Sequence, residues 1–141
     1  MTSGAAAVEY EAVVKNYGMV HALRGVDLVI RHGEIFGLIG PDGAGKSSMI
    51  RMAMGIINPT SGHCRLLGDD NRRRARRRAG YVPQIFSLYT NMSVMENIRL
   101  FGSLYGAARH EVESRAEYIL SRVGLWGFRD RFAGDLSGGM K

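Results

Sequence analysis

One glycine-rich string restricts the fold of this chain more than any other feature. Residues 40–47 read GPDGAGKS, which fits the pattern G-x-x-x-x-G-K-[ST]. The apolar segment 35–39 precedes the string and is typical of a strand buried on both faces. Residues 47–54 follow as a predicted helix that ends at Gly55. A strand, a glycine-rich turn and a helix in this order predict a loop that binds phosphate.

The pattern assigns a role to the residues of this loop. Glycines let the backbone approach a ligand closely, and the amides and the helix N-terminus attract the α- and β-phosphates. We expect Lys46 to reach the β- and γ-phosphates, Ser47 to ligate Mg²⁺ through its hydroxyl, and the carboxylate of Asp42 to face away. The predicted nucleotide-binding residues of the loop are Gly40, Asp42, Gly43, Ala44, Gly45, Lys46, Ser47 and Ser48.

The composition limits the kinds of partner that the chain can have, but it does not identify one. The formal net charge of +6 favours anionic partners, and nucleotides, nucleic acid and anionic lipid all qualify. The single cysteine, Cys64, excludes an internal disulfide and lies in an apolar run, so we expect a buried and inert thiol. No window approaches the roughly 20 apolar residues of a membrane span. The chain is expected to be soluble and cytoplasmic, and any membrane work requires a separate partner.

Hydrophobic periodicity predicts the remaining elements. Alternation over 8–14 and 26–30 indicates two half-buried strands of a small antiparallel sheet, packed onto a parallel α/β core, with residues 15–18 as a turn. In the first strand, Val8, Tyr10, Ala12 and Val14 are expected on the buried face. Short strands are predicted over 63–67 and 81–84, and helices from Ser93, which has capping-box spacing, to Gly106 and over about 110–123.

Residues 72–78, RRRARRR, are the most unusual part of the composition. A segment this charged predicts an exposed connector. The alternative is a contact with phosphate backbones or lipid headgroups, although no aromatic residue lies between the arginines to stack on bases.

A second motif, LSGGMK at 136–141, is weak evidence by itself. It becomes specific because it lies about ninety residues after the glycine-rich loop and follows two predicted helices. Together with GPDGAGKSS at 40–48 and GYVPQ at 80–84, it resembles the ATP-binding subunits of ABC transporters. The resemblance runs from about Val8 to the last residue. Asp42, Met140 and residues 88–97 are most similar to drug-efflux exporters of the ABC-2 type, whose membrane part is a separate subunit.

The resemblance implies further roles and partners. Tyr17 matches the aromatic residue that stacks on the adenine of ATP, and Gln84 matches the glutamine that reaches Mg²⁺ and the attacking water. Residues Ser137, Gly138 and Gly139 match the signature that caps the γ-phosphate bound by the opposite subunit of a head-to-tail dimer. A membrane permease is the implied partner, no nucleic acid is expected, and the implied location is the inner face of the cell membrane.

Departures from the family pattern limit what this chain is expected to do alone. Asp42 stands where most members have Asn, and Met140 where many have Gln. The family hydrolyses ATP with an acidic pair and a histidine that follow the signature, and this sequence stops before them. We therefore expect an incomplete ABC ATPase domain, with negligible hydrolysis of its own: an α/β fold with a P-loop NTPase core, a small antiparallel β-subdomain and a helical subdomain.

The expected organisation is a flexible tail at 1–7, the β-subdomain and first part of the core at 8–86, and the helical subdomain at 87–141. The main functional hypothesis is the ATP-binding subunit of an exporter. Two alternatives are an ABC-type ATPase that acts on nucleic acid or ribosomes, and a nucleotide sensor that does not hydrolyse.

Overall fold

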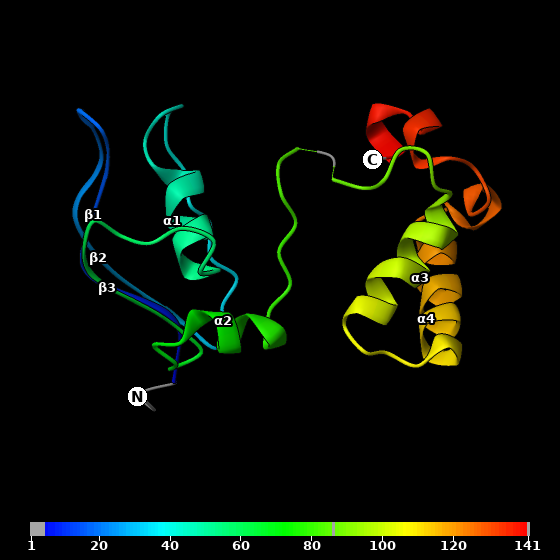
Figure 1. Cartoon of the computed structure of the whole chain (residues 1–141), viewed down its shortest axis with the longest axis horizontal. Coiled ribbons are helices and arrows are strands. Elements are labelled where there is room, and N and C mark those ends of the chain that lie inside the picture. The colour runs from blue at the N-terminus through cyan, green and yellow to red at the C-terminus, as the bar shows by residue number, and fades with distance from the viewer. Residues whose placement is uncertain (1–4, 86, 141) are drawn as a thin grey trace. The chain divides into compact units, whose positions relative to one another are not determined.

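The chain contains two compact units, Met1–Tyr81 and Val82–Lys141, in the computed structural model (Figure 1). The structure describes residues 5–85 and 87–140. Most of the expected tail at 1–7 lies outside the described residues, and residues 6 and 7 already belong to the first strand. The expected boundary after residue 86 stays a prediction.

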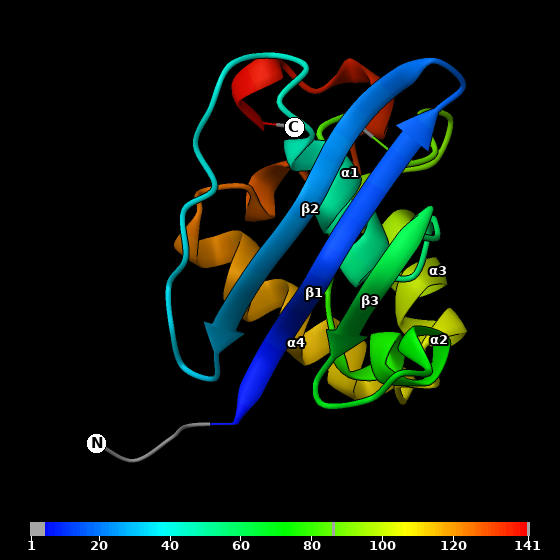
Figure 2. The same ribbon diagram turned by 90° about the vertical axis from the view of Figure 1, so that its left-hand side faces the viewer.

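An antiparallel sheet forms the frame of the first unit. Strands β1 (Ala6–Tyr17), β2 (Val20–Arg31) and β3 (Ser61–Leu66) lie in the order β2-β1-β3 (Figure 2). The predicted antiparallel strands are confirmed, and the first two are longer than expected. The predicted turn at 15–18 is wrong in its position, because β1 continues to Tyr17 and the chain reverses at Gly18 with a φ of 58°.

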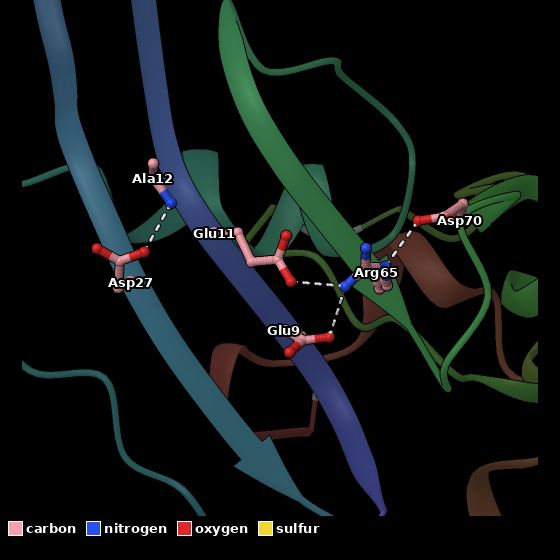
Figure 3. A network of polar contacts seen from close by, with 6 residues as sticks. All are labelled: Glu9, Glu11, Ala12, Asp27, Arg65 and Asp70. Carbon is pink, nitrogen blue, oxygen red and sulfur yellow. Dashed lines mark hydrogen bonds and ion pairs between the residues drawn. The ribbon is translucent and has the colours of Figure 1, made fainter.

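A bulge at Ala12 changes which side of β1 faces the core. Ala12 has a φ of 46°, and the pairing registers of β1 shift on both sides of it. Val13 is therefore fully buried at 0 % exposure, whereas Ala12 is exposed, so the predicted buried face is wrong beyond Tyr10. The Ala12 amide, freed from the regular ladder, donates to Asp27 Oδ1 at 2.7 Å (Figure 3). Gly62 lies so close to the Ala12 carbonyl that a Cβ there would overlap it.

A charged network crosses the other face of the sheet. Arg65 on β3 bonds to Glu11 at 2.6 Å and Glu9 at 3.1 Å on β1, and to Asp70 at 2.9 Å (Figure 3). One guanidinium thus joins two strands and the turn that follows β3. A shared arginine of this kind holds several carboxylates with one side chain, which fixes the relative position of β1 and β3.

Helix α1 (Lys46–Ala53) packs on the sheet and supplies three of the seven buried residues of this core. The helix contributes Met49, Met52 and Ala53, and Met52 is 0 % exposed. Tyr10 Oη donates to the Met49 carbonyl at 2.9 Å, and burial raises the pKa of Tyr10, which keeps this hydroxyl a neutral donor. Ile50 is 46 % exposed, so the helix turns this apolar side chain partly to solvent. The buried residues of this core are Tyr10, Val13, Leu23, Met49, Met52, Ala53 and Cys64.

Two predicted strands are absent from the described part of the chain. Residues 35–39 have no regular structure, and Ile35 and Ile39 are 102 % and 94 % exposed. Residues 81–84 likewise form no strand. A strand exists only where another strand accepts its ladder bonds, and the described residues contain none that pairs with either segment. The predicted parallel sheet is therefore not formed among them, and the antiparallel sheet stands without it.

The arginine run folds as helix α2 (Arg72–Ala75) and a 3₁₀ turn, η1 (Arg76–Arg78). The expected exposed connector is confirmed for Arg76–Arg78. It is wrong for Arg72, whose guanidinium donates to the Met52 carbonyl at 2.9 Å and to Asn58 Oδ1 at 3.0 Å. The first arginine of the run thus belongs to the packing of α1, which composition alone could not indicate.

The second unit is an antiparallel pair of helices followed by short turns. Helix α3 (Val94–Leu104) begins at the predicted capping box, in which Ser93 and Glu96 exchange hydrogen bonds with each other's backbone amides. Helix α4 (Arg109–Arg122) follows, and a Cβ at Gly102 would overlap Val112, which shows how closely the helices approach. The 3₁₀ turns are η2 (Trp126–Phe128), η3 (Ala133–Asp135) and η4 (Gly138–Met140). Within the residues described, none of the helices has the length and apolarity that a bilayer crossing requires.

Asn97 fixes the loop that leads into α3. Its side chain is fully buried, accepts from the Tyr89 amide at 2.8 Å, and donates to the carbonyls of Tyr89 and Ser93 at 3.0 Å and of Met92 at 3.3 Å. A buried amide with all these partners holds the turn in one conformation. Sequence analysis did not identify this residue, because an Asn in a helical pattern is ordinarily placed on the surface.

We predict that Asn97→Ala lowers the free energy of unfolding of the second unit by about 2 kcal/mol, because it leaves buried backbone groups without partners. Urea unfolding followed by the fluorescence of Trp126, the single tryptophan, measures this loss. Asn91→Ala, at an exposed position of the same loop, is the control and should change stability little. Equal effects of the two substitutions would contradict the role assigned to Asn97.

Candidate functional site

The glycine-rich loop has the backbone conformation that its sequence predicts. Gly43 and Gly45 have φ values of 81° and 85°, which residues with a side chain rarely adopt. A Cβ at Gly45 would lie 2.6 Å from Leu23 Cδ2 and 2.7 Å from the Ala22 carbonyl oxygen, both on β2. Gly43 meets no such atoms. Gly45 is therefore required both by its dihedral angle and by the close approach of the loop to the sheet.

The start of α1 presents a set of free amides. The first helical bond runs from the Met49 amide to the Gly45 carbonyl at 2.9 Å. Within the residues described, the amides of Gly45, Lys46, Ser47 and Ser48 therefore have no acceptor. Consecutive unpaired N–H groups at a helix N-terminus carry partial positive charge and bind anions. No acidic side chain lies in the first turn to neutralise that charge.

Lys46 adds a full positive charge to these amides. Its Nζ donates to the carbonyl oxygens of Gly40 and Pro41, at 2.6 Å in each case. These bonds hold the ammonium over the loop, and among the described residues they use two of its three N–H groups. Asp42, the carboxylate in this loop, is exposed. Its predicted orientation away from the ligand stays a prediction.

Tyr17 lies beside the first turn of α1, and its predicted stacking on adenine stays a prediction. Its hydroxyl is 3.1 Å from Ser48 Oγ, and 46 % of the residue is exposed. The sequence analysis missed Lys15, whose Nζ is 4.9 Å from the centroid of the Tyr17 ring. The signal was present, because residues two apart on a strand lie on the same face.

Cys64 takes no part in the site. The thiol is free and buried beneath α1, as predicted, and burial raises its pKa above the ordinary value. A neutral, buried thiol is a poor nucleophile and metal ligand, so this part of the prediction is confirmed.

The structure brings Tyr17 together with the loop, but the remaining predicted residues belong to the other unit. Gln84 is exposed in a bend, and Ser137, Gly138 and Gly139 are exposed near the end of the described chain. The signature forms a single 3₁₀ turn, closed by a bond of 2.9 Å from the Met140 amide to the Ser137 carbonyl. The roles of Gln84 and of the signature stay predictions.

Backbone hydrogen bonds that the sequence did not predict hold the segment that leads to the signature. The segment 129–134 runs beside the start of α3 and accepts from the Val94 amide through the Arg131 carbonyl, at 3.0 Å. The Ala133 amide in turn donates to the Met92 carbonyl at 2.9 Å. Leu136 is buried in the core of this unit, next to the exposed Ser137. The signature is thus presented to solvent from an anchored segment.

The donor set suits Mg²⁺ only in combination with a phosphate ligand. No group of three or more His, Cys, Asp or Glu side chains gathers among the described residues to hold an ion by itself. Mg²⁺ retains waters and is commonly held by one or two protein oxygens plus phosphate oxygens. The exposed hydroxyl of Ser47, beside the free amides, fits that arrangement.

We predict that Gly45→Ala abolishes anion binding at the loop, whereas Gly43→Ala weakens it less. Both substitutions place a side chain at a positive φ, but only the Gly45 Cβ would also collide with β2. Titration with inorganic tripolyphosphate measures binding, and thermal melting measures stability. Identical losses in the two variants would show that contact with β2 does not constrain the loop.

Known proteins resemble this chain along most of its length. The family described as "ABC transporter" matches residues 23–141. The Nod factor export ATP-binding protein I of Burkholderia thailandensis is 37 % identical over 139 residues, which cover 96 % of this chain and 46 % of that protein. The methionine import ATP-binding protein MetN of Cupriavidus metallidurans is 43 % identical over 132 residues, covering 88 % and 38 %. The probable multidrug ABC transporter ATP-binding protein YbhF of Escherichia coli is 35 % identical over 143 residues, covering 99 % and 25 %.

Solved structures agree with these relatives. An ATP-binding subunit of an ABC transporter superposes with a TM-score of 0.83 at 30 % identity, covering 94 % of this chain and 57 % of that one. A dimeric ATP-binding cassette in a post-hydrolysis state with ADP and Pi gives 0.82 at 30 % identity, covering 94 % and 64 %. The predicted fold class is confirmed. The chain spans less than half the length of the three curated relatives. With the family matched over residues 23–141, the chain belongs to the ABC transporter family and covers part of its ATP-binding domain.

Proposed function

We propose that this chain is the nucleotide-binding part of the ATP-binding subunit of an ABC exporter, which works with a separate membrane permease. The observation that carries the proposal is the start of α1. Four consecutive amides, those of residues 45–48, have no acceptor in the described part of the chain, and the Lys46 ammonium is bonded to the same loop at Gly40 and Pro41. A triphosphate tail matches this arrangement because it offers several anionic oxygens to consecutive donors.

The residues of the first unit then take the following roles. The loop amides hold the β-phosphate, and Lys46 neutralises charge on the β- and γ-phosphates. Mg²⁺ would be held by Ser47 together with phosphate oxygens, and it supplies charge neutralisation on the transferred phosphate. Tyr17 offers its exposed ring to the adenine base.

The second unit supplies the roles that couple ATP to transport. Gln84 would contact Mg²⁺ and the attacking water, and Ser137, Gly138 and Gly139 would cap the γ-phosphate bound by a second copy in a head-to-tail dimer. Exposure of all four residues supports this, since each must reach a partner outside its own unit. One solved relative is described as a dimer with ADP and Pi. Through its permease the subunit would lie at the cytoplasmic face of the membrane.

The choice of exporter rests on Asp42, Met140 and residues 88–97, which are most similar to drug-efflux exporters. Two of the relatives are described as an export protein and a probable multidrug transporter protein, and a third as an import protein. Transport assayed with the cognate permease in vesicles gives the direction. The alternative of a nucleic-acid ATPase has less support, because Arg72 and Arg74 already bond within their own unit.

We predict that Lys46→Ala weakens the binding of Mg-ATP by about ten- to a hundredfold, the value of a lost charge-assisted contact. Calorimetric titration of the 141-residue chain measures the dissociation constant. Arg24→Ala, which removes an exposed charge from β2, is the control and should leave binding unchanged. Unchanged binding in Lys46→Ala would reject the loop as the ATP site.

We further predict that the chain alone hydrolyses ATP negligibly, because the proposed function gives none of its carboxylates the role of activating water. Release of inorganic phosphate from Mg-ATP measures turnover. A rate above background that disappears in Lys46→Ala would show instead that the described residues suffice for catalysis.

A further inference from the structure

The ring of Tyr17 has two neighbours, Lys15 and Ser48, and 46 % of the residue is exposed. We propose that Lys15 and Ser48 are positioning residues, which fix this ring so that the face away from Lys15 receives the base of the nucleotide. The inference rests on the proposed nucleotide site and adds to it the residues that position the base.

Lys15 covers one face of the ring. Its Nζ lies 4.9 Å from the ring centroid, within the range of a cation–π contact. The same Nζ donates to the carbonyl of Asn58 at 2.8 Å, and Asn58 lies in the segment between α1 and β3. The ammonium is therefore tied at a second point, and a base cannot stack on the face that it occupies.

Ser48 fixes the edge of the ring without covering a face. The phenolic oxygen lies in the ring plane, and it is 3.1 Å from Ser48 Oγ. Ser48 is in the first turn of α1 and follows the predicted Mg²⁺ ligand Ser47. The hydrogen bond thus sets the position of the ring relative to the helix that carries the free amides.

These contacts determine which phosphate ligands the site should bind more tightly. Lys15 lies over one face and Ser48 is bonded at the edge, so we assign the exposure of Tyr17, 46 % of the residue, to the opposite face, where a flat ligand can stack. Stacking on an aromatic face tolerates any base, because every base has a π-face. The site should therefore distinguish a nucleoside triphosphate from inorganic tripolyphosphate, and distinguish ATP from GTP only weakly.

The test compares Mg-ATP, Mg-GTP and Mg-tripolyphosphate as ligands of the 141-residue chain. Lys15→Met keeps the length of the side chain but removes the cation. We expect it to weaken binding of both nucleotides about fivefold and to leave tripolyphosphate unchanged. Lys15→Arg keeps a cation over the ring, so this variant should bind both nucleotides as tightly as the unaltered chain does. Circular dichroism and thermal melting verify that each variant is folded.

Ser48 is tested through a double-mutant cycle. Tyr17→Phe and Ser48→Ala each remove one end of the same hydrogen bond, so each should weaken nucleotide binding by a similar factor. The double variant should be no weaker than either single variant. Tripolyphosphate binding should not change in Tyr17→Phe, which alters only the ring end of the hydrogen bond.

Several outcomes would overturn the inference. Equal losses for nucleotide and tripolyphosphate in Lys15→Met would show a general electrostatic effect, and no loss at all would show that Lys15 does not position the ring. Loss of tripolyphosphate binding in Ser48→Ala would make Ser48 a phosphate contact. In all these cases the proposed function stands, provided that the unaltered chain binds Mg-ATP and that Lys46→Ala binds it about ten- to a hundredfold more weakly. Failure of the unaltered chain to bind any ligand would reject both.

Discussion

The seating of α1 on the antiparallel sheet is the interaction on which the first unit depends. Met52 and Val13, one from each layer, are fully buried, and Tyr10 bonds to the carbonyl of Met49 across the interface. Because the glycine-rich loop continues directly into α1, every contact that fixes the helix also fixes the loop. Gly45 completes this by letting the loop approach β2 without a collision.

The two ends of α1 differ in how their backbone groups are hydrogen-bonded, and this difference creates the candidate binding site. At the C-terminal end, the Met52 carbonyl accepts from the guanidinium of Arg72, and a positive side chain there complements the helix dipole. At the N-terminal end, the amides of residues 45–48 have no acceptor within the described residues. The unit thus satisfies one end of the helix internally and leaves the other end for an anion from outside.

Local signals predicted more of this structure than long-range ones. The glycine-rich turn before α1, the Ser93 capping box and the extent of α4 each depend on residues a few positions apart, and each was predicted correctly from the sequence. The bulge at Ala12 and the hydrogen bonds of Arg72 depend on partners far away in the sequence, so hydrophobic periodicity could not predict them. The segment 35–39 failed for a related reason, since apolar content predicts a strand only when another strand is available to pair with it.

The lack of a strand at 35–39 also shows which contacts maintain the loop. These residues pair with no strand among the described residues, although Leu38 packs against the core. The first half of the loop is bonded to Lys46, whose ammonium donates to the carbonyls of Gly40 and Pro41. Under the proposed function, a triphosphate would compete with those carbonyls for the same ammonium. The charge that orders the loop is then the charge that binds the ligand, and Lys46 connects the local fold to the chemistry.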